Sequence, residues 1–279
     1  MKTKWLIDNY MVEKSDQDDF LDIFKRNNFE YELQSYVHFK EKNETKFNQE
    51  DCVVIYGSIA FVKQNINNGF IPGAYLQEQA MNCTGYIPYI DDNKILANSN
   101  HVFATYKDFK NRKDFFYDVF NTNEIFIRPN GGLKTFTGLP IKKKDFDYEI
   151  NSLEQLTSVS ENTLILISDC KDITYEYRFF IVNREVISGS QYKKNDELIV
   201  KSGYSDEAFE IALKMAANKW QPDIAYVCDV GIVNGEPKII ELNSFSCSGF
   251  YACDIGLIIN AIDYSAIKEY NGEISIGDI

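Results

Sequence analysis

The amino-acid sequence predicts an α/β (α+β) protein, and three observations lead to this fold class. A short apolar run at residues 52–56 ends in a Gly-Ser turn, which is typical of a buried parallel strand that leads into a helix. From about residue 101, helical periodicity alternates with strands and with long strand pairs around turn-forming dipeptides. The chain has 279 residues, 44% of them hydrophobic, which suffices to bury one large core or two smaller ones.

The composition also argues against several classes of function. A net charge of −13 disfavours binding to a nucleic-acid backbone or to an anionic membrane. No apolar run approaches the roughly 18 residues of a membrane span or resembles a signal peptide, so a cytoplasmic protein is expected. The two histidines, His38 and His101, lack metal-ligand spacing, which disfavours zinc and histidine-dependent nucleophilic chemistry. The six cysteines form no CxxC pair and are expected to be reduced and mostly buried.

The first hundred residues are expected to form a small α/β unit. Alternating residues over 29–39 predict a strand, and the buried strand at 52–56 follows. The turn at Gly57-Ser58 could contact a ligand, although a tight strand-to-helix connection is the commoner use of such a turn.

The remaining elements follow in order. Helices are predicted over 107–120, 152–159, 205–220 and 256–267, with Ser205 as the N-cap of the third. Strands are predicted over 124–129 and 163–168, followed by two long strands around Asn183-Arg184 and a hairpin over 227–243.

The hairpin contains a candidate metal site. In "PKIIELN", residues 237–243, the strand period of two places Ile239, Glu241 and Asn243 on one face. Asp229 on the preceding strand can add a third oxygen ligand. Oxygen donors suit a hard divalent cation such as the Mg²⁺ that nucleotide phosphates carry. A solvent-facing polar stripe on a half-exposed hairpin explains the same pattern equally well.

The turn of this hairpin decides whether the two acids share a face. A two-residue turn at 234–235, Asn-Gly, is the local preference, but it would pair Asp229 with Ile240 and leave Glu241 on the other face. A three-residue loop that includes Glu236 sets Asp229 directly opposite Glu241. If the acids form one site, the sequence therefore predicts a loop of three or five residues.

Two further patterns could bind a nucleotide. In the first, a strand ends at Arg128 and leads into a Gly-Gly loop that carries Lys134; bare backbone, a planar fork and a point charge all suit phosphate. An ordinary turn with a solvated lysine is the alternative. In the second, Glu176 and Arg178 share a strand face. They could serve a ribose hydroxyl and a transferring phosphoryl group, or form only an ion pair.

The order of these patterns resembles the ATP-grasp superfamily. Five patterns follow one another between about residues 100 and 270: a strand with a cation, a Gly-rich loop with a lysine, an acid-x-arginine strand, an Asp strand and the "IELN" strand. The resemblance implies an ATP-grasp domain at 101–279, whose two α+β lobes clasp ATP. It also implies that residues 1–100 are an N-terminal α/β substrate-binding domain of the pre-ATP-grasp type.

The resemblance assigns roles to most of the candidate residues. "IELN" after an Asp-bearing strand is similar to the metal signature of the family, which makes Asp229, Glu241 and Asn243 the Mg²⁺ ligands. "EYRFFI" is similar to the strand in which an acid binds the ribose hydroxyls and an arginine contacts the γ-phosphate and the acyl phosphate. These roles fall to Glu176 and Arg178.

Three other residues complete the implied nucleotide site. Asp169 lies seven residues before Glu176, where the family has an adenine-side hinge acid or amide. Members of the family normally carry a lysine directly before the proline of the strand known for its "KP" pair. In this sequence Arg128 stands at that position instead. This is similar to a clade in which arginine takes that place and a loop lysine, here Lys134, serves the phosphates.

The implied function is an ATP- and Mg²⁺-dependent ligase that joins a carboxylate to an amine as an amide or peptide bond. In the family, ATP phosphorylates the carboxylate, and the amine then attacks the acyl phosphate. The substrates would be a small molecule or peptide with a carboxylate and an amine acceptor. Two alternatives stay open: a phosphotransferase on the same fold, and a non-enzymatic nucleotide-binding interaction module. The sequence defines neither the substrates nor the oligomeric state.

Overall fold

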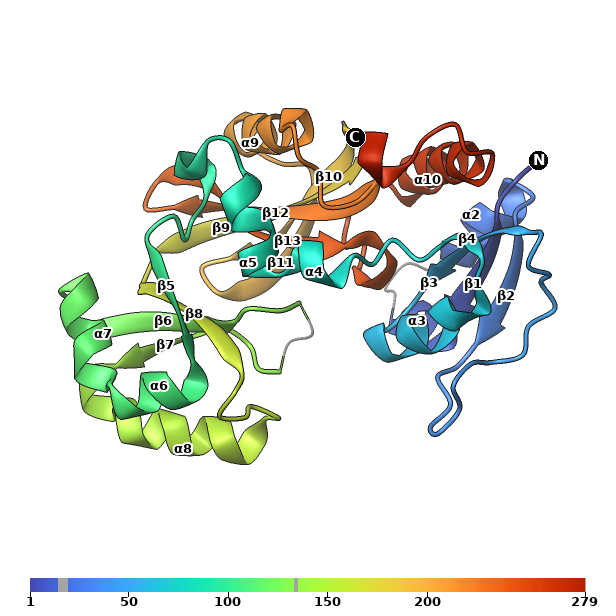
Figure 1. Cartoon of the computed structure of the whole chain (residues 1–279). Helices are drawn as coiled ribbons and strands as arrows, with labels where there is room; N and C mark the ends of the chain where they lie inside the picture. The colour runs from blue at the N-terminus through green and yellow to red at the C-terminus, as the bar shows by residue number, and fades with distance from the viewer. Residues whose placement is uncertain (15–19, 133–134, 279) are drawn as a thin grey trace.

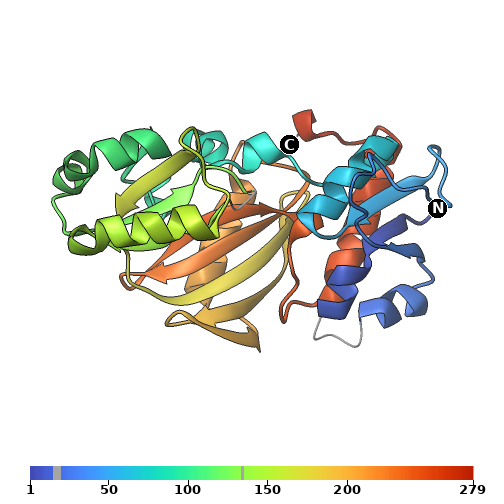
Figure 2. The ribbon, with the colours of Figure 1, turned by 90° about the horizontal axis from the view of Figure 1, so that it is seen from below.

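The computed structural model describes residues 1–14, 20–132 and 135–278, which fold into three sheets and their flanking helices (Figure 1). Seen from below, a five-stranded sheet lies between an N-terminal parallel sheet and a four-stranded antiparallel sheet (Figure 2). This mixture confirms the predicted α/β (α+β) class. In the described part of the chain, no helix has both the length and the apolar character needed to cross a membrane.

The N-terminal parallel sheet has the order β2-β1-β3-β4. Its strands are β1 (Lys4–Asp8), β2 (Glu30–Gln34), β3 (Cys52–Tyr56) and β4 (Ile71–Gly73), with helices α1 (Asn9–Lys14), α2 (Phe20–Arg26) and α3 (Ile59–Asn65) and a 3₁₀ turn at Ile66–Asn68. As predicted, β3 is buried along its whole length. The strand expected over 29–39 ends at Gln34, because its only sheet neighbour, β1, ends at the paired residue Asp8.

A linking segment carries the chain to the four-stranded antiparallel sheet, whose order is β5-β8-β6-β7. The linking segment contains α4 (Glu78–Met81), α5 (Cys83–Tyr86) and 3₁₀ turns at Ile87–Tyr89 and Asn93–Ile95. The sheet consists of β5 (His101–Thr105), β6 (Glu124–Pro129), β7 (Leu139–Lys142) and β8 (Leu164–Asp169), packed on α6 (Tyr106–Asn111), α7 (Lys113–Phe120) and α8 (Phe146–Leu156), which follows a 3₁₀ turn at Lys143–Asp145. The helix predicted over 107–120 is split at Arg112, whose backbone is not helical.

The five-stranded sheet is antiparallel, with the order β11-β10-β9-β12-β13. Its strands are β9 (Ile173–Val182), β10 (Glu185–Lys194), β11 (Glu197–Ser202), β12 (Ala225–Val233) and β13 (Glu236–Ser244); the helices are α9 (Asp206–Ala217) and α10 (Ile255–Tyr270), with 3₁₀ turns at Phe245–Cys247 and Ile276–Asp278. Ser205 caps α9 as predicted, since its side chain accepts from the Ala208 N–H.

Hydrophobic packing joins the N-terminal and five-stranded sheets. Apolar side chains of β1 and β3 share one core cluster with α2, with the ends of β9 and β12, and with α10. The other face of the five-stranded sheet packs on α9. The division into domains at residue 100 remains a prediction, although β5 begins at His101. All six cysteines carry free thiols, and four of them are buried.

Candidate functional site

The β12–β13 hairpin turns in two residues, so the predicted loop of three or five residues is wrong. Asn234 and Gly235 take the left-handed φ values of 50° and 83° that a tight hairpin turn of this kind demands. Asp229 nevertheless pairs with Glu241, as the metal hypothesis requires. A β-bulge reconciles the two facts, because Ile240 is an extra residue that shifts the register by one.

The bulge also corrects the expected faces of β13. Ile239 pairs with Val230 and lies in the hydrophobic core with Leu242, on the face away from the acids. Ile240 and Glu241 both border the smaller of two cavities described below. The period of two therefore holds on each side of the bulge but not across it.

The three predicted metal ligands lie together on one face of the five-stranded sheet. The side-chain amide nitrogen of Asn243 donates to Asp229 Oδ2 at 3.0 Å and to Glu241 Oε1 at 2.9 Å. Asp229 is fully buried, while Glu241 is about one-fifth exposed. These two hydrogen bonds hold the Asn243 amide beside both carboxylates. Three oxygen-bearing side chains therefore lie together at one place.

Each of these carboxylates also faces an arginine. Arg178 on β9 donates from Nε and Nη2 to the two Asp229 oxygens at 2.9 and 2.8 Å. Burial lowers the pKa of Arg178, but the Asp229 charge outweighs it and the net pKa is raised. Arg128 on β6 donates to Glu241 Oε2 at 2.8 Å and to the Ile240 carbonyl at 3.3 Å. This second pair connects the four-stranded sheet to the five-stranded sheet.

Glu176 forms the third acid–base pair of the region. Its carboxylate accepts from the Tyr192 hydroxyl and lies 3.0 Å from Lys193 Nζ. Lys193 also contacts Asp196 at the tip of the β10–β11 hairpin. Glu176, Asp229 and Glu241 are thus each paired with a cationic side chain of this protein.

The smaller cavity, about 390 Å³, lies between the four-stranded and five-stranded sheets. Its charged lining is Arg128, Lys171, Asp172, Glu176, Lys193, Asp196 and Glu241. Asp169 does not border it; the residues that follow, from Cys170 to Ile173, do, and Asp169 forms an ion pair with Lys171. Lys134 lies outside the described residues.

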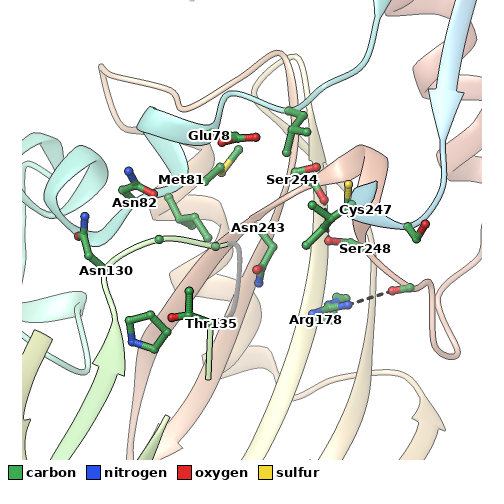
Figure 3. A pocket seen from close by; sticks show the side chains of 18 of the residues that line it. Glu78, Met81, Asn82, Asn130, Thr135, Arg178, Asn243, Ser244, Cys247 and Ser248 are labelled. Carbon is green, nitrogen blue, oxygen red and sulfur yellow. Dashed lines mark hydrogen bonds between the residues drawn. The ribbon is translucent and has the colours of Figure 1, made fainter. Parts of the chain in front are cut away.

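The larger cavity, about 690 Å³, lies between the N-terminal sheet and the two other sheets (Figure 3). Glu78, Met81 and Asn82 lie along one end, and Arg178 lies at the other, near Ser248 (Figure 3). Pro129 and Gly131 border both cavities, so the two spaces meet at the Gly-rich loop.

Ser58 makes the tight strand-to-helix connection considered for its turn, and it also lies beside a cavity. Its hydroxyl accepts from the Phe61 N–H and caps α3, and it donates to buried Asp8 at 2.6 Å. It also lines the larger cavity. Gly57 leaves no room for a side chain, because a Cβ there would lie 2.5 Å from the Asp8 Cβ.

Sequence reasoning did not single out Tyr192, Lys193 or Tyr251. A regular hairpin around Asn183-Arg184 would pair Glu176 with Gln191. Two register shifts in β10 bring Lys193 opposite Glu176 instead. No local pattern announces such bulges, so the contact could not be derived from spacing.

The donor set bears on which cation could bind. Within the described ranges, no three His, Cys, Asp or Glu side chains cluster as a metal site. A cation here would depend on Asp229, Glu241, the Asn243 amide oxygen and oxygens of a ligand. All are hard donors, which fits Mg²⁺ and not zinc.

Comparison with protein-family models assigns residues 105–260 to a known family. Residues 105–260 match the family described as "ATP-grasp domain, R2K clade family 2". The match covers more than half of the sequence and includes all eight predicted site residues. No curated protein matches the sequence.

Solved structures share the fold over nearly the whole chain. D-alanine–D-alanine ligase from Bacillus anthracis has a TM-score of 0.60 at 10% identity, covering 98% of this chain and 100% of that one. D-cycloserine synthetase DcsG gives 0.59 at 9%, covering 97% and 98%. The ATP-grasp ligase PsnB, complexed with a minimal precursor, gives 0.57 at 11%, covering 95% and 99%. At such low identity these similarities establish the fold alone.

Proposed function

Because this chain belongs to family 2 of the R2K clade of ATP-grasp domains, we propose that it is an ATP- and Mg²⁺-dependent carboxylate–amine ligase. The observation that carries the proposal is that two cavities share the Gly-rich loop and that one hydrogen-bonded cluster of charges reaches from one to the other. Arg178 borders the larger cavity, Glu241 borders the smaller one, and Asn243 bonds to Glu241 and to Asp229, the partner of Arg178. A phosphoryl group could pass between two bound molecules only at such a junction.

The smaller cavity is the proposed ATP site. The segment from Cys170 to Ile173 would face the adenine, where Asp169 was expected to do so. Glu176 would accept from the ribose hydroxyls, and Arg128 would bind the phosphates with its planar fork. Arg128 is already held between two acceptors, so nucleotide binding would exchange one set of oxygen partners for another.

Asp229, Glu241 and Asn243 would hold Mg²⁺. When bound there, the ion would neutralise the charge of the ATP phosphates. Arg128 and Arg178 neutralise Glu241 and Asp229 in the free protein. With a cation beside those carboxylates, the two arginines would be available to the nucleotide and the substrate. In its absence the same carboxylates remain charge-paired, which explains how buried acids are tolerated in the free protein.

The larger cavity is the proposed site of the carboxylate and the amine. A carboxylate oxygen attacks the γ-phosphorus of ATP, and ADP leaves. The amine nitrogen then attacks the acyl carbon, phosphate leaves, and the amine loses a proton. Arg178 has the position to stabilise charge on the transferring group and on the acyl phosphate. No histidine is needed for this chemistry, because phosphoryl transfer depends mainly on positioning and charge neutralisation.

The lining supports a small-molecule or peptide substrate. In the described lining of the larger cavity, Arg178 and Glu78 are the charged side chains, and the rest are amides, hydroxyls and apolar groups. Among the similar structures, the ATP-grasp ligase PsnB is complexed with a precursor peptide, and another is a D-cycloserine synthetase. A net charge of −13 argues against nucleic acid or an anionic membrane as the partner.

An ATP-consumption screen over pooled amino acids and short peptides tests the proposal. We expect ADP and phosphate, with a product whose mass equals the two substrates minus one water. A phosphorylated product without free phosphate would instead establish a phosphotransferase. Absence of ATP consumption in every pool would favour the non-enzymatic interaction module.

A pair of matched variants makes the screen specific. Arg178→Met should remove the product. Arg184→Met should keep it, because among the described residues Arg184 bonds to the Asn218 and Lys219 carbonyls alone, and it borders neither cavity. Equal loss in both variants would contradict the role of Arg178.

A further inference from the structure

Two tyrosines stack on each other beside Arg178. Tyr192 lies in β10 and Tyr251 in the segment between β13 and α10, and their ring centroids are 4.8 Å apart with planes within 7°. The Arg178 Cζ lies 4.8 Å from the Tyr251 centroid and 5.5 Å from that of Tyr192. Both distances fall inside the roughly 6 Å range of a cation–π contact. Tyr192 borders the smaller cavity and Tyr251 the larger one.

The hydrogen bonds of Arg178 leave part of its guanidinium for a ligand. A guanidinium has five N–H donors in one plane. Asp229 takes two of them and the Gly249 carbonyl takes a third at 3.1 Å, the bond dashed in Figure 3. Among the bonds to described residues, one hydrogen on each Nη is therefore left. Those two hydrogens lie in the guanidinium plane, so the tilt of that plane decides where they point.

The backbone of Tyr251 is unusual for a bulky residue. Its φ of 50° is left-handed, a region in which a tyrosine is strained. Strain of this kind persists only where the surrounding structure enforces it. Here the left-handed residue is also the one whose ring lies on Tyr192 and faces Arg178.

Tyr192 connects the stacked rings to Glu176, the residue proposed to bind the ribose hydroxyls. Its hydroxyl donates to Glu176, and the acid also contacts Lys193. Burial raises the pKa of Tyr192 well above its usual value, so the hydroxyl keeps the proton that it donates.

We propose that Tyr251 and Tyr192 are positioning residues, in which the Tyr251 ring fixes the plane of Arg178 for the transferring phosphoryl group and the Tyr192 hydroxyl fixes Glu176 for the nucleotide. What Arg178 and Glu176 are positioned for, namely the phosphoryl group and the nucleotide, rests on the proposed ligase function. The arrangement itself can be tested without turnover.

The first test is nuclear magnetic resonance of the arginine side chains, which number only five. The Arg178 signal is assigned by its loss in Arg178→Lys. In the wild type we expect a slowly exchanging Nε–H and hindered rotation of the guanidinium. Tyr251→Leu should lose both, and Tyr251→Phe should keep both. Tyr89→Leu, which breaks the separate Tyr89–Trp220 stack, is the control that should change neither.

The second test is steady-state kinetics with ATP. Tyr251→Leu should lower kcat on the order of 10- to 100-fold, as expected for a misplaced catalytic group, with little change in the KM for ATP. Tyr251→Phe should restore most of kcat. Tyr192→Phe keeps the ring and loses the hydroxyl, so it should mainly raise the KM for ATP.

The two tests separate the proposal from the proposed function. If Tyr251→Leu leaves the Arg178 signals unchanged, the positioning role is wrong whatever the enzyme does. If the signals change as expected but no ATP turnover exists, the positioning of Arg178 stands and the ligase function fails. If kcat and KM for ATP change together in both tyrosine variants, the tyrosines support the fold and do not position separate groups.

Discussion

Replacing Arg178 with methionine is expected to destabilise the free protein by about 3–5 kcal/mol. Breaking a buried ion pair by removing one partner typically costs this much, because a charge stays buried without its compensation. Asp229 is fully buried and accepts two bonds from Arg178, at 2.9 and 2.8 Å. In the variant, the Asn243 amide would still donate to Asp229, which places the cost toward the lower end of the range.

Urea unfolding followed by tryptophan fluorescence measures this cost. Trp220 lies between α9 and β12, the strand that carries Asp229, and it stacks on Tyr89. With a slope of about 2.5 kcal/mol per molar urea, a loss of 3–5 kcal/mol lowers the midpoint by about 1–2 M. The surface control Arg184→Met should lower it by much less, since that side chain bonds to two carbonyls near the protein surface.

A double variant tests the cause of the loss. Replacing Arg178 with methionine and Asp229 with leucine removes both charges, and buried ion pairs exchanged for apolar residues are often close to neutral. We therefore expect the double variant to be more stable than Arg178→Met alone by at least about 2 kcal/mol. If the two substitutions simply add, or if Arg178→Met costs under about 1 kcal/mol, the reasoning from a buried uncompensated charge is refuted.

Three more predictions concern the same region and the core. ATP with Mg²⁺ should raise the melting temperature, and Glu241→Gln should weaken the Mg²⁺-dependent part of that shift without unfolding the free protein; an unfolded variant would make Glu241 structural. Arg128→Lys should lose one of its two contacts, cost about 1–2 kcal/mol in urea unfolding and reduce turnover more than tenfold, whereas surviving turnover would show that a point charge suffices. Burial raises the pKa of Asp223 well above its usual value, so its contribution to stability is lost as pH rises from the unfolded value of about 3.9 toward the folded one. Asp223→Asn should therefore raise the urea midpoint at pH 7 and flatten its pH dependence, and an unchanged pH profile would count against this.

The sequence alone determined the fold class and most elements of the second half of the chain. Helix periodicity and the Ser205 cap are local properties, and local steric and hydrogen-bonding preferences fix them. The two-residue Asn-Gly turn was the local preference too, although the metal hypothesis led us to predict a longer loop. The identities of the candidate residues were also visible, because acids and arginines inside apolar strands need a compensating partner. The ordered set of motifs led to the ATP-grasp family, to which the chain belongs.

Only the tertiary structure decided how those residues meet. The Ile240 bulge sets Asp229 opposite Glu241 despite a two-residue turn, and the bulges of β10 bring Lys193 to Glu176. A bulge leaves one residue unpaired and bends its strand, and no local pattern in β10 or β13 marked where these bulges would fall. The same holds for the stack of Tyr251 on Tyr192, whose residues are 59 positions apart and meet only because the five-stranded sheet and the segment after β13 fold together.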